Sequence, residues 1–213
     1  MSRLEVSAIA PNFLDRTEKF AEMLARWGAK MNLTAHPEDP EETAFHIIDC
    51  LTPLVLESEP AGYHLRAGFA RGKRVLDVGS GAGFPGLVFA SASEAGFTLC
   101  EARRKRASFL KIASAEMGLT NVTVEPRHLS PADLDGDFDL VTSRALGPPA
   151  EFYGIAAAAL RNGGIAILYA NPAQRLDVED AHSAGLGAEV RVPYGLRRGK
   201  TVVKRVLMLW RKM

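Results

Sequence analysis

The sequence predicts an α/β fold built on a mostly parallel sheet with helices on both faces. Short apolar segments alternate with helical segments after Gly72, a pattern typical of such sheets. The first apolar segment, residues 73–78, continues directly into a glycine-rich stretch, DVGSGAGFPG, at residues 77–86. With 213 residues, of which 47% are apolar and 24% charged, the chain is long enough for one such domain with an appendage.

Residues 1–60 are predicted to form a helical cap that precedes this domain. A first amphipathic helix is indicated by side chains at helical spacing. These are Phe13, Thr17, Phe20, Leu24 and Trp27, with Leu14 and Ala21 beside them. A second helix is expected to begin at residues 39–42, where Asp-Pro-Glu-Glu combines an N-cap, a first-position proline and first-turn acids. Pro53 is expected to kink or end it. Its apolar positions are Ala44, Ile47, Ile48, Leu51 and Val55.

Residues 61–213 are predicted to form the sheet domain, and the two parts together one compact unit. Strands are expected at 73–78, 97–100, 122–124, 138–142, 164–169, 188–192 and 203–210. Helices are expected to begin near Pro85 and to cover 103–117, 149–160 and 173–184. A short loop rich in glycine and arginine joins the last two strands, which predicts an antiparallel hairpin.

Composition excludes several classes of protein. Cys50 and Cys100 are the only cysteines, and no Cys/His cluster occurs. We therefore expect neither a disulfide framework nor a metal site, and we expect the protein to lie in a reducing cytoplasm. The N-terminus reaches charged residues too early for a secretory signal. No apolar run is long enough to span a bilayer, which would take about 20 residues. The net charge is only +1, but basic residues gather at 103–106 and 197–212.

The glycine-rich stretch can be read in two frames. Residues 81–86 match G-x-G-x-x-G, the fingerprint of a dinucleotide site for NAD or FAD. Read two residues earlier, Asp77 is followed by Gly79, Gly81 and Gly83, which suggests S-adenosylmethionine. Glu101 lies 20 residues after Gly81, where an acid takes ribose hydroxyls. Because both ligands contain an adenosine ribose, Glu101 does not choose between them.

Two residues favour the S-adenosylmethionine frame. A carboxylate at Asp77 is unfavourable beside a pyrophosphate but suits a ligand with an ammonium and a sulfonium. Pro85 removes a main-chain N–H at the helix start, where a dinucleotide site needs donors for its phosphates. An NAD-linked oxidoreductase, a non-catalytic adenosyl-nucleotide-binding module and a purely structural glycine turn stay open as alternatives.

Several motifs resemble those of a known family. DVGSGAGFPG is followed by KRASFL at 105–110 and FDLVTSRA at 138–145, and is preceded by MNLTA at 31–35 and HIIDCL at 46–51. Together they resemble the bacterial 16S rRNA guanine-N7 methyltransferases, the small-subunit methyltransferase G family formerly called glucose-inhibited division protein B. The resemblance runs from about residue 12 to the C-terminus and is weakest in the last part of the chain.

The resemblance implies a class I S-adenosylmethionine-dependent methyltransferase fold, a Rossmann-like seven-stranded sheet with its last strand antiparallel and an N-terminal helical extension. It implies methyl transfer from S-adenosylmethionine to N7 of one guanine of 16S ribosomal RNA. A methyltransferase acting on another RNA, a protein or a small molecule is the alternative. Guanine N7 has an available lone pair, so no general base is expected.

The resemblance also assigns site residues. Arg144 would lie where cofactor and target base meet, and is the expected catalytic residue. Glu101 would hold the ribose, while His128 and Leu129 would line the adenine, Leu129 through its main chain. Together with the loop frame, these assignments give the expected cofactor-binding residues: Asp77, Gly79, Gly81, Phe84, Glu101, His128, Leu129 and Arg144.

Contacts with RNA are expected from two regions. The first is the polar loop with Asn32, near which His36 also lies. The second is the basic C-terminal loop with Arg197, Arg198, Lys200 and Lys204. The sequence Tyr169-Ala170-Asn171 stands where the family has Lys-Gly, so a lysine role in RNA binding is either lost or passed to Lys200 or Lys204. We expect a monomer whose partner is 16S rRNA or the small ribosomal subunit; naked and assembled RNA both fit.

Overall fold

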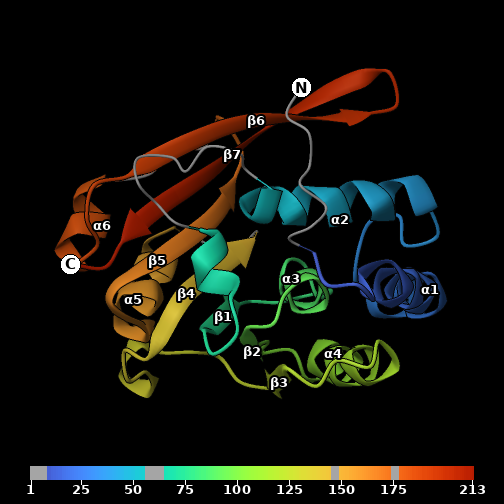
Figure 1. Cartoon of the computed structure of the whole chain (residues 1–213), viewed down its shortest axis with the longest axis horizontal. Helices are drawn as coiled ribbons and strands as arrows, with labels where there is room; N and C mark the ends of the chain where they lie inside the picture. The colour runs from blue at the N-terminus through green and yellow to red at the C-terminus, as the bar shows by residue number, and fades with distance from the viewer. Residues whose placement is uncertain (1–8, 56–64, 145–148, 174–177) are drawn as a thin grey trace.

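The chain folds into a seven-stranded sheet between two helical layers (Figure 1). The computed structural model describes residues 9–55, 65–144, 149–173 and 178–213. The strand order is β3-β2-β1-β4-β5-β7-β6. The strands are β1 (Arg74–Val78), β2 (Gly96–Cys100), β3 (Val122–Glu125), β4 (Phe138–Arg144), β5 (Leu160–Ala170), β6 (Val190–Arg198) and β7 (Thr201–Arg211).

Strand directions confirm the predicted fold class. Strands β1 to β5 are parallel, and β7 runs antiparallel between β5 and β6. The expected terminal hairpin is present and longer than predicted, because Gly199 turns the chain at a φ of 56° and pairing starts at once on both sides. Since β5 ends at Ala170, opposite Val206, residues 194–205 extend past the carboxyl end of β5. We call this extension the arm.

Helices cover both faces of the sheet. On one face lie α1 (Phe13–Met31), α2 (Pro40–Val55), α3 (Gly86–Ala92) and α4 (Arg104–Glu116), and on the other lie α5 (Pro149–Ala159) and α6 (Val178–Ser183). Two short 3-10 helices, η3 (Arg66–Phe69) and η4 (Pro131–Asp133), complete the elements of the described ranges.

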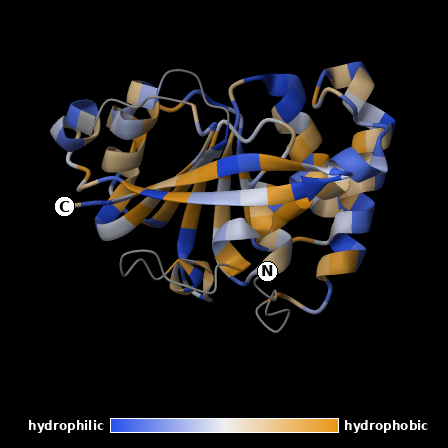
Figure 2. Cartoon of the chain, turned by 90° about the horizontal axis from the view of Figure 1, so that it is seen from above, coloured by the Kyte–Doolittle hydropathy of each residue, from blue (hydrophilic) through white to orange (hydrophobic). Residues whose placement is uncertain are grey.

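The core is correspondingly divided into two clusters. Val75 belongs to the cluster under α1, α3 and α4, whereas the next residue, Leu76, belongs to the cluster under α5. This alternation is the period of two expected of a strand covered on both faces. Figure 2 shows the apolar colour gathered in the strands and on the helix faces turned toward them. The division expected at residue 60 falls at 56–64, outside the described residues, and stays a prediction.

Helix α1 buries a face slightly different from the predicted one. Phe13, Thr17, Phe20 and Leu24 are buried as expected. Leu14, by contrast, is 78% exposed, because it lies on the outer side of the helix. Trp27 is 38% exposed, and Lys30 lies 5.8 Å above its ring.

Helix α2 differs more from the prediction. Ile48, expected on the buried face, is 49% exposed, whereas the next residue, Asp49, is 2% exposed. The physical reason is that α2 lies across the carboxyl ends of β4 and β5, where its neighbours are polar and charged side chains. Pro53 lies inside α2, which continues to Val55. The helix predicted at 173–184 is observed only at 178–183, and residues 174–177 lie outside the described ranges.

Candidate functional site

The glycine loop connects β1 to α3 at the carboxyl edge of the sheet, where open α/β sheets bind ligands. Three of its glycines adopt left-handed backbone conformations, with φ of 70° at Gly79, 55° at Gly81 and 101° at Gly83. Glycine reaches this region without strain. A Cβ added at Gly81 would meet nothing closer than the carbonyl oxygen of Gly79, at 3.7 Å. The loop therefore leaves room above Gly81.

Several main-chain N–H groups of the loop are already used inside the protein. Those of Gly79 and Ser80 donate to the carbonyl of Cys100, at 2.9 and 3.0 Å. That of Gly83 donates to the carbonyl of Ser80 at 2.7 Å, and Pro85 has no N–H. A pyrophosphate cradle needs such donors aimed at the ligand. The loop is therefore poorly suited to bind a dinucleotide.

Glu101 lies directly after β2 and is 6% exposed. Its Oε2 accepts a hydrogen bond from Gly81 N–H at 3.0 Å, and its Oε1 accepts one from Arg103 N–H at 2.8 Å. The carboxylate thus stands between the glycine loop and the start of α4. A carboxylate oxygen has lone pairs for more than one donor, so Glu101 retains the capacity to accept from a ligand hydroxyl.

Asp77 lies beneath the loop and is fully buried. Its Oδ1 accepts a hydrogen bond from the Thr142 hydroxyl at 3.0 Å, and its Oδ2 accepts one from Gly86 N–H at 3.2 Å. A Cβ at Gly86 would lie 2.6 Å from the same Oδ2. Burial raises the pKa of Asp77 to about 6, against the hydrogen bonds that favour its charged form. Asp77 therefore holds β1, β4 and the start of α3 together. Its carboxylate is used in these internal bonds, whereas the sequence suggested a direct contact with the ligand's ammonium or sulfonium.

The ring of Phe84 is placed differently from the prediction. We expected it to face the cofactor, but the residue is 7% exposed and packs against Phe20 of α1, with 5.1 Å between ring centroids. The ring centroid of His46 lies 5.5 Å away, and the guanidinium carbon of Arg144 lies 5.3 Å from the Phe84 centroid. The N-terminal helices supply the apolar partners that bury this ring. A ligand contact at this position would come from the main chain.

Arg144, at the end of β4, is held by three residues of α2. Its Nη2 lies 2.9 Å from His46 Nδ1, while its Nη1 lies 3.5 Å from Asp49 Oδ2 and 3.6 Å from Cys50 Sγ. The Arg144 side chain is 20% exposed. The resemblance placed Arg144 at the site, and the structure adds that α2 fixes its guanidinium there.

Helix α2 has a polar face that the sequence analysis does not predict. Glu42, His46 and Asp49 are spaced by four and three residues, which places them on one helix face. This spacing was the available signal. His46 Nε2 lies 3.4 Å from Glu42 Oε1. Burial, then Arg144 and two further arginines, lower the pKa of His46 to about 4, so its ring is neutral at pH 7. A neutral ring with its proton on Nε2 accepts from Arg144 at Nδ1.

The pair expected at the adenine is divided between surface and core. The His128 side chain is 73% exposed, and its Nε2 lies 3.5 Å from Glu151 Oε1. Leu129 is 4% exposed and belongs to the core under α5. Its side chain is occupied by packing, in keeping with a contact through the main chain only.

Asn32 has a structural role that accounts for its residue type. It is the C-cap of α1, in the left-handed conformation with φ 51° and ψ 51°, which Asn tolerates better than most residues. Its carbonyl accepts a hydrogen bond from Arg106 Nη2 at 2.8 Å. Arg106 Nη1 lies 3.9 Å from where a Cβ of Gly81 would stand. Arg106 thus links the end of α1 to the glycine loop. His36 is exposed, with its Nδ1 3.9 Å from Glu38 Oε1.

The arm carries the expected basic residues at its exposed end. Arg197, Arg198, Lys200 and Lys204 are all exposed. Arg198 forms an ion pair with Glu42 of α2, which places the arm over that helix. Val202, also in the arm, is 62% exposed. The arm is thus a cationic projection at the same edge of the sheet as the glycine loop.

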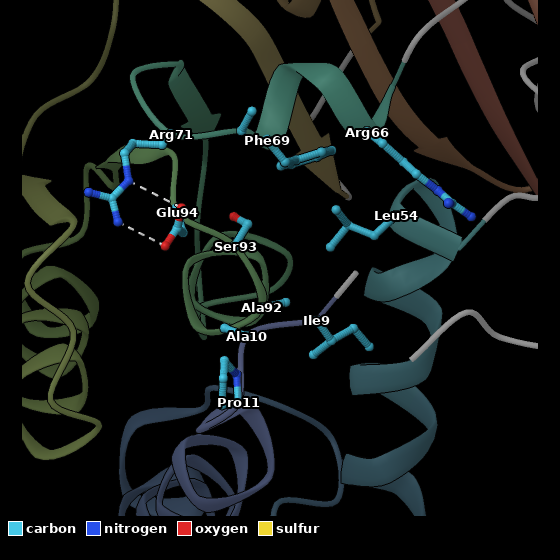
Figure 3. A pocket seen from close by; sticks show the side chains of 11 residues that line it. Ile9, Ala10, Pro11, Leu54, Arg66, Phe69, Arg71, Ala92, Ser93 and Glu94 are labelled. Atoms are coloured by element: carbon cyan, nitrogen blue, oxygen red, sulfur yellow. Dashed lines mark hydrogen bonds and ion pairs between the residues drawn. The ribbon is translucent and has the colours of Figure 1, made fainter. Parts of the chain in front are cut away.

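The cavity in Figure 3 lies elsewhere. Its volume is about 410 Å³, and Phe69, Leu54 and the Arg71–Glu94 ion pair are among its lining. Residues 70–73 precede β1 and residues 93–95 precede β2, so it opens at the amino edge of the sheet, opposite the glycine loop. The described residues contain no group of three or more His, Cys, Asp or Glu side chains arranged to hold a metal ion. No helix in the described ranges is long and apolar enough to cross a membrane.

Comparison with known proteins supports one family. A family model described as rRNA small subunit methyltransferase G (GidB) matches residues 14–190. The chain is 36% identical over 146 residues to the ribosomal RNA small subunit methyltransferase G of Laribacter hongkongensis, covering 68% of this chain and 64% of that protein. It is 34% identical over 198 residues to the protein of the same name from Sorangium cellulosum, covering 90% and 78%. The chain therefore spans less than two thirds of the length of the first of these relatives.

A solved structure with the same fold is that of the tRNA methyltransferase TrmI from Aquifex aeolicus. The TM-score is 0.56 at 16% sequence identity, with 77% of this chain and 76% of that chain covered. At this identity the likeness concerns the fold alone.

Proposed function

The chain belongs to the rRNA small subunit methyltransferase G (GidB) family, and from this premise we propose that it transfers a methyl group from S-adenosylmethionine to N7 of one guanine of 16S ribosomal RNA. The observation that carries the proposal is the glycine loop with Glu101 at its side. The loop has room above Gly81, and a buried carboxylate borders that room. S-adenosylmethionine, which has a sulfonium and no phosphate, fits this arrangement better than a ligand with a pyrophosphate does.

The loop geometry and the family resemblance together indicate which residues would hold the cofactor. Gly79 and Gly81 would let its methionine part approach the main chain, and Glu101 would accept from the ribose hydroxyls. The resemblance assigns His128 and Leu129 to the adenine, where Leu129 would contribute its main chain. Asp77 supports the loop from below through Gly86 rather than touching the ligand. When bound, the cofactor supplies an activated methyl group on a sulfonium.

The chain's own contribution to the reaction is alignment. Guanine N7 carries a lone pair and no proton, so no side chain has to act as a base. Catalysis then comes mainly from holding N7 in line with the methyl carbon and the sulfur of the cofactor, in a site that excludes water. We assign Arg144 to the guanine O6 or to a neighbouring phosphate, because N7 has to stay free to receive the methyl group.

The arm is proposed to hold the RNA. Arg197, Lys200 and Lys204 provide exposed cations beyond the carboxyl edge of the sheet, and phosphates dominate affinity for nucleic acid. Arg198 would join them when RNA competes with Glu42. Asn32 and His36 are further proposed contacts from the loop after α1. We also propose that the protein acts in the cytoplasm and as a monomer. Light scattering of the purified chain at micromolar concentration would test the oligomeric state.

The decisive experiment is methyl transfer from labelled cofactor onto undermethylated small subunits and onto naked 16S rRNA. We expect label in one of the two substrates, and 7-methylguanine after digestion and mass spectrometry. Label in another nucleotide would move the target. Binding of S-adenosylhomocysteine without any transfer would favour a non-catalytic module.

Calorimetry with two ligands tests the class of enzyme. We expect S-adenosylhomocysteine to bind and NADH not to bind, because the loop N–H groups of Gly79, Ser80 and Gly83 are already used. Binding of NADH alone would replace the methyltransferase proposal with an oxidoreductase.

A further inference from the structure

Asp49 is a buried carboxylate of α2 that faces the end of β4 and the middle of the β6–β7 hairpin. Its side chain is 3% exposed. Oδ2 lies 3.5 Å from Arg144 Nη1 and 3.6 Å from Arg205 Nε. Oδ1 accepts a hydrogen bond from the Tyr194 hydroxyl at 2.6 Å. One carboxylate thus joins α2 to β4, β6 and β7.

Such a position is costly for a charged group unless partners compensate for lost water. Two guanidinium groups and one hydroxyl supply that compensation. An asparagine at the same place would still accept from Tyr194, but its amide carries no charge for the two arginines. The charge on Asp49 is therefore matched to the arginines more than to the tyrosine.

The shared oxygen, Oδ2, connects two functional parts. Arg144 lies at the proposed meeting point of the cofactor and the target guanine. Arg205 lies where the arm joins the sheet. Arg144 is also restrained by His46 Nδ1 at 2.9 Å and by the Phe84 ring. An arginine side chain that is free in solution loses much rotamer entropy when it is fixed. Because Asp49 and His46 hold the guanidinium from α2, that ordering is already present before RNA binds.

We propose that Asp49 is a positioning residue, which fixes the guanidinium of Arg144 for methyl transfer and ties it to the arm through Arg205. This rests on the proposed function, since Arg144 has to act on the RNA base or its phosphate. Asp49 itself touches neither cofactor nor base. Its effect on turnover passes through Arg144.

The test compares Asp49→Asn with Tyr194→Phe. Both remove part of the same network, but only Asp49→Asn removes the charge that holds Arg144. We expect Asp49→Asn to lower kcat by about 10- to 100-fold, since small misplacements of a positioning group cost that much. The KM for rRNA should change less than threefold. Tyr194→Phe leaves the carboxylate and both arginines in place, so its loss of kcat should be at least fivefold smaller than that of Asp49→Asn. Equal losses in the two variants would show a merely structural role.

A double-mutant cycle shows whether Asp49 acts through Arg144. If it does, Asp49→Asn should change kcat by less than twofold in an Arg144→Ala background. If the loss of kcat in the double variant equalled the product of the losses in the two single variants, the proposal would be overturned. Circular dichroism and thermal unfolding of each variant accompany the kinetics.

A measurement on the wild-type protein keeps the proposal testable if Asp49→Asn does not fold. In spectra of protein with ¹⁵N-labelled arginine, the guanidinium of Arg144 should give separate Nη signals that report restricted rotation. A single averaged signal would overturn the proposal. This measurement needs no RNA and no turnover, so it distinguishes failure of the positioning role from failure of the proposed function, which would appear as absence of methyl transfer by the wild type.

Discussion

Glu101 accepts a hydrogen bond from the main-chain N–H of Gly81, with 3.0 Å between its Oε2 and the nitrogen. The bond joins the end of β2 to the loop after β1, across 20 residues of sequence. The carboxylate that the sequence assigns to a ligand ribose therefore also shapes the loop that would carry the ligand. Binding and loop geometry are coupled at this residue.

Replacing Glu101 by Gln should weaken cofactor binding. The Glu101 carboxylate accepts hydrogen bonds from Gly81, Arg103 and the proposed ribose hydroxyls, and the amide of Gln has no negative charge. Charge-assisted hydrogen bonds are roughly twice as strong as neutral ones. We expect the Kd for S-adenosylhomocysteine to rise about tenfold, equivalent to about 1.4 kcal/mol, as measured by calorimetry. The matched control is Glu125→Gln at the end of the neighbouring β3, where the carboxylate pairs with Arg127 at 2.7 Å. Equal affinities of Glu101→Gln and the wild type would remove Glu101 from the ribose site.

Replacing Gly81 by Asp should abolish detectable binding of S-adenosylhomocysteine. The φ of 55° is unfavourable for a residue with a side chain, and the new carboxylate would fill the room above the loop and repel Glu101. Gly118→Asp is the control, because Gly118 has a φ of 64° with open space around it. The two variants share the backbone strain and the added charge. Only the variant in the loop should lose binding in calorimetry, and unchanged affinity there would mean that the ligand lies elsewhere.

The buried carboxyl of Asp77 should make stability depend on pH near 6. Its pKa of about 6 in the folded protein lies above the ordinary value of 3.8, so the folded state binds this proton more tightly than the unfolded state does. The contribution of Asp77 to the free energy of unfolding should therefore increase as pH falls from 6 toward 4, by up to about 3 kcal/mol. The measurement is urea unfolding of the wild type and Asp77→Asn from pH 4 to 8. A pH-independent difference between the two would contradict the raised pKa.

Neutralising the arm should weaken RNA binding without affecting the cofactor. Each phosphate contact that is lost reduces the slope of log affinity against log salt concentration by about 0.7 to 0.9. Filter binding of 16S rRNA at several salt concentrations measures this slope, and calorimetry with S-adenosylhomocysteine should stay unchanged. The variant replaces three exposed cations by Gln: Arg197, Lys200 and Lys204.

The control for the arm removes the same number of charges from the helices α1 and α4. Its substitutions to Gln are at three exposed positions: Lys19, Arg26 and Lys111. Because both variants change the net charge equally, a general loss of attraction would affect them alike. Equal salt slopes for the two variants would argue against the arm as the RNA contact.

Local sequence patterns suffice to predict the succession of strands and helices along the chain and the location of the glycine loop. The reason is that these features are local. Periods of two and of about 3.6 residues follow from backbone geometry, and glycine is the residue that adopts positive φ without strain, as Gly79, Gly81 and Gly83 do. Glu101 could also be located, because its distance from the loop along the chain is set by one crossover of the parallel sheet.

The side chains that surround Arg144 come from distant parts of the chain and could not be predicted from local patterns. Its contact with Asp49 joins residues 95 positions apart, and no local pattern specifies such a pair. The buried face of α2 also differs from the predicted one: Leu51 is buried as expected, but Ile48 is exposed and Asp49 is covered. Phe84 is buried for a related reason, since Phe20 of α1 packs against it. Burial of a side chain depends on which element folds over it. Helix α1 packs on α3 and α4, whereas α2 contacts the ends of β4 and β5 through Arg144 and Tyr169, and neither arrangement is specified by a local pattern.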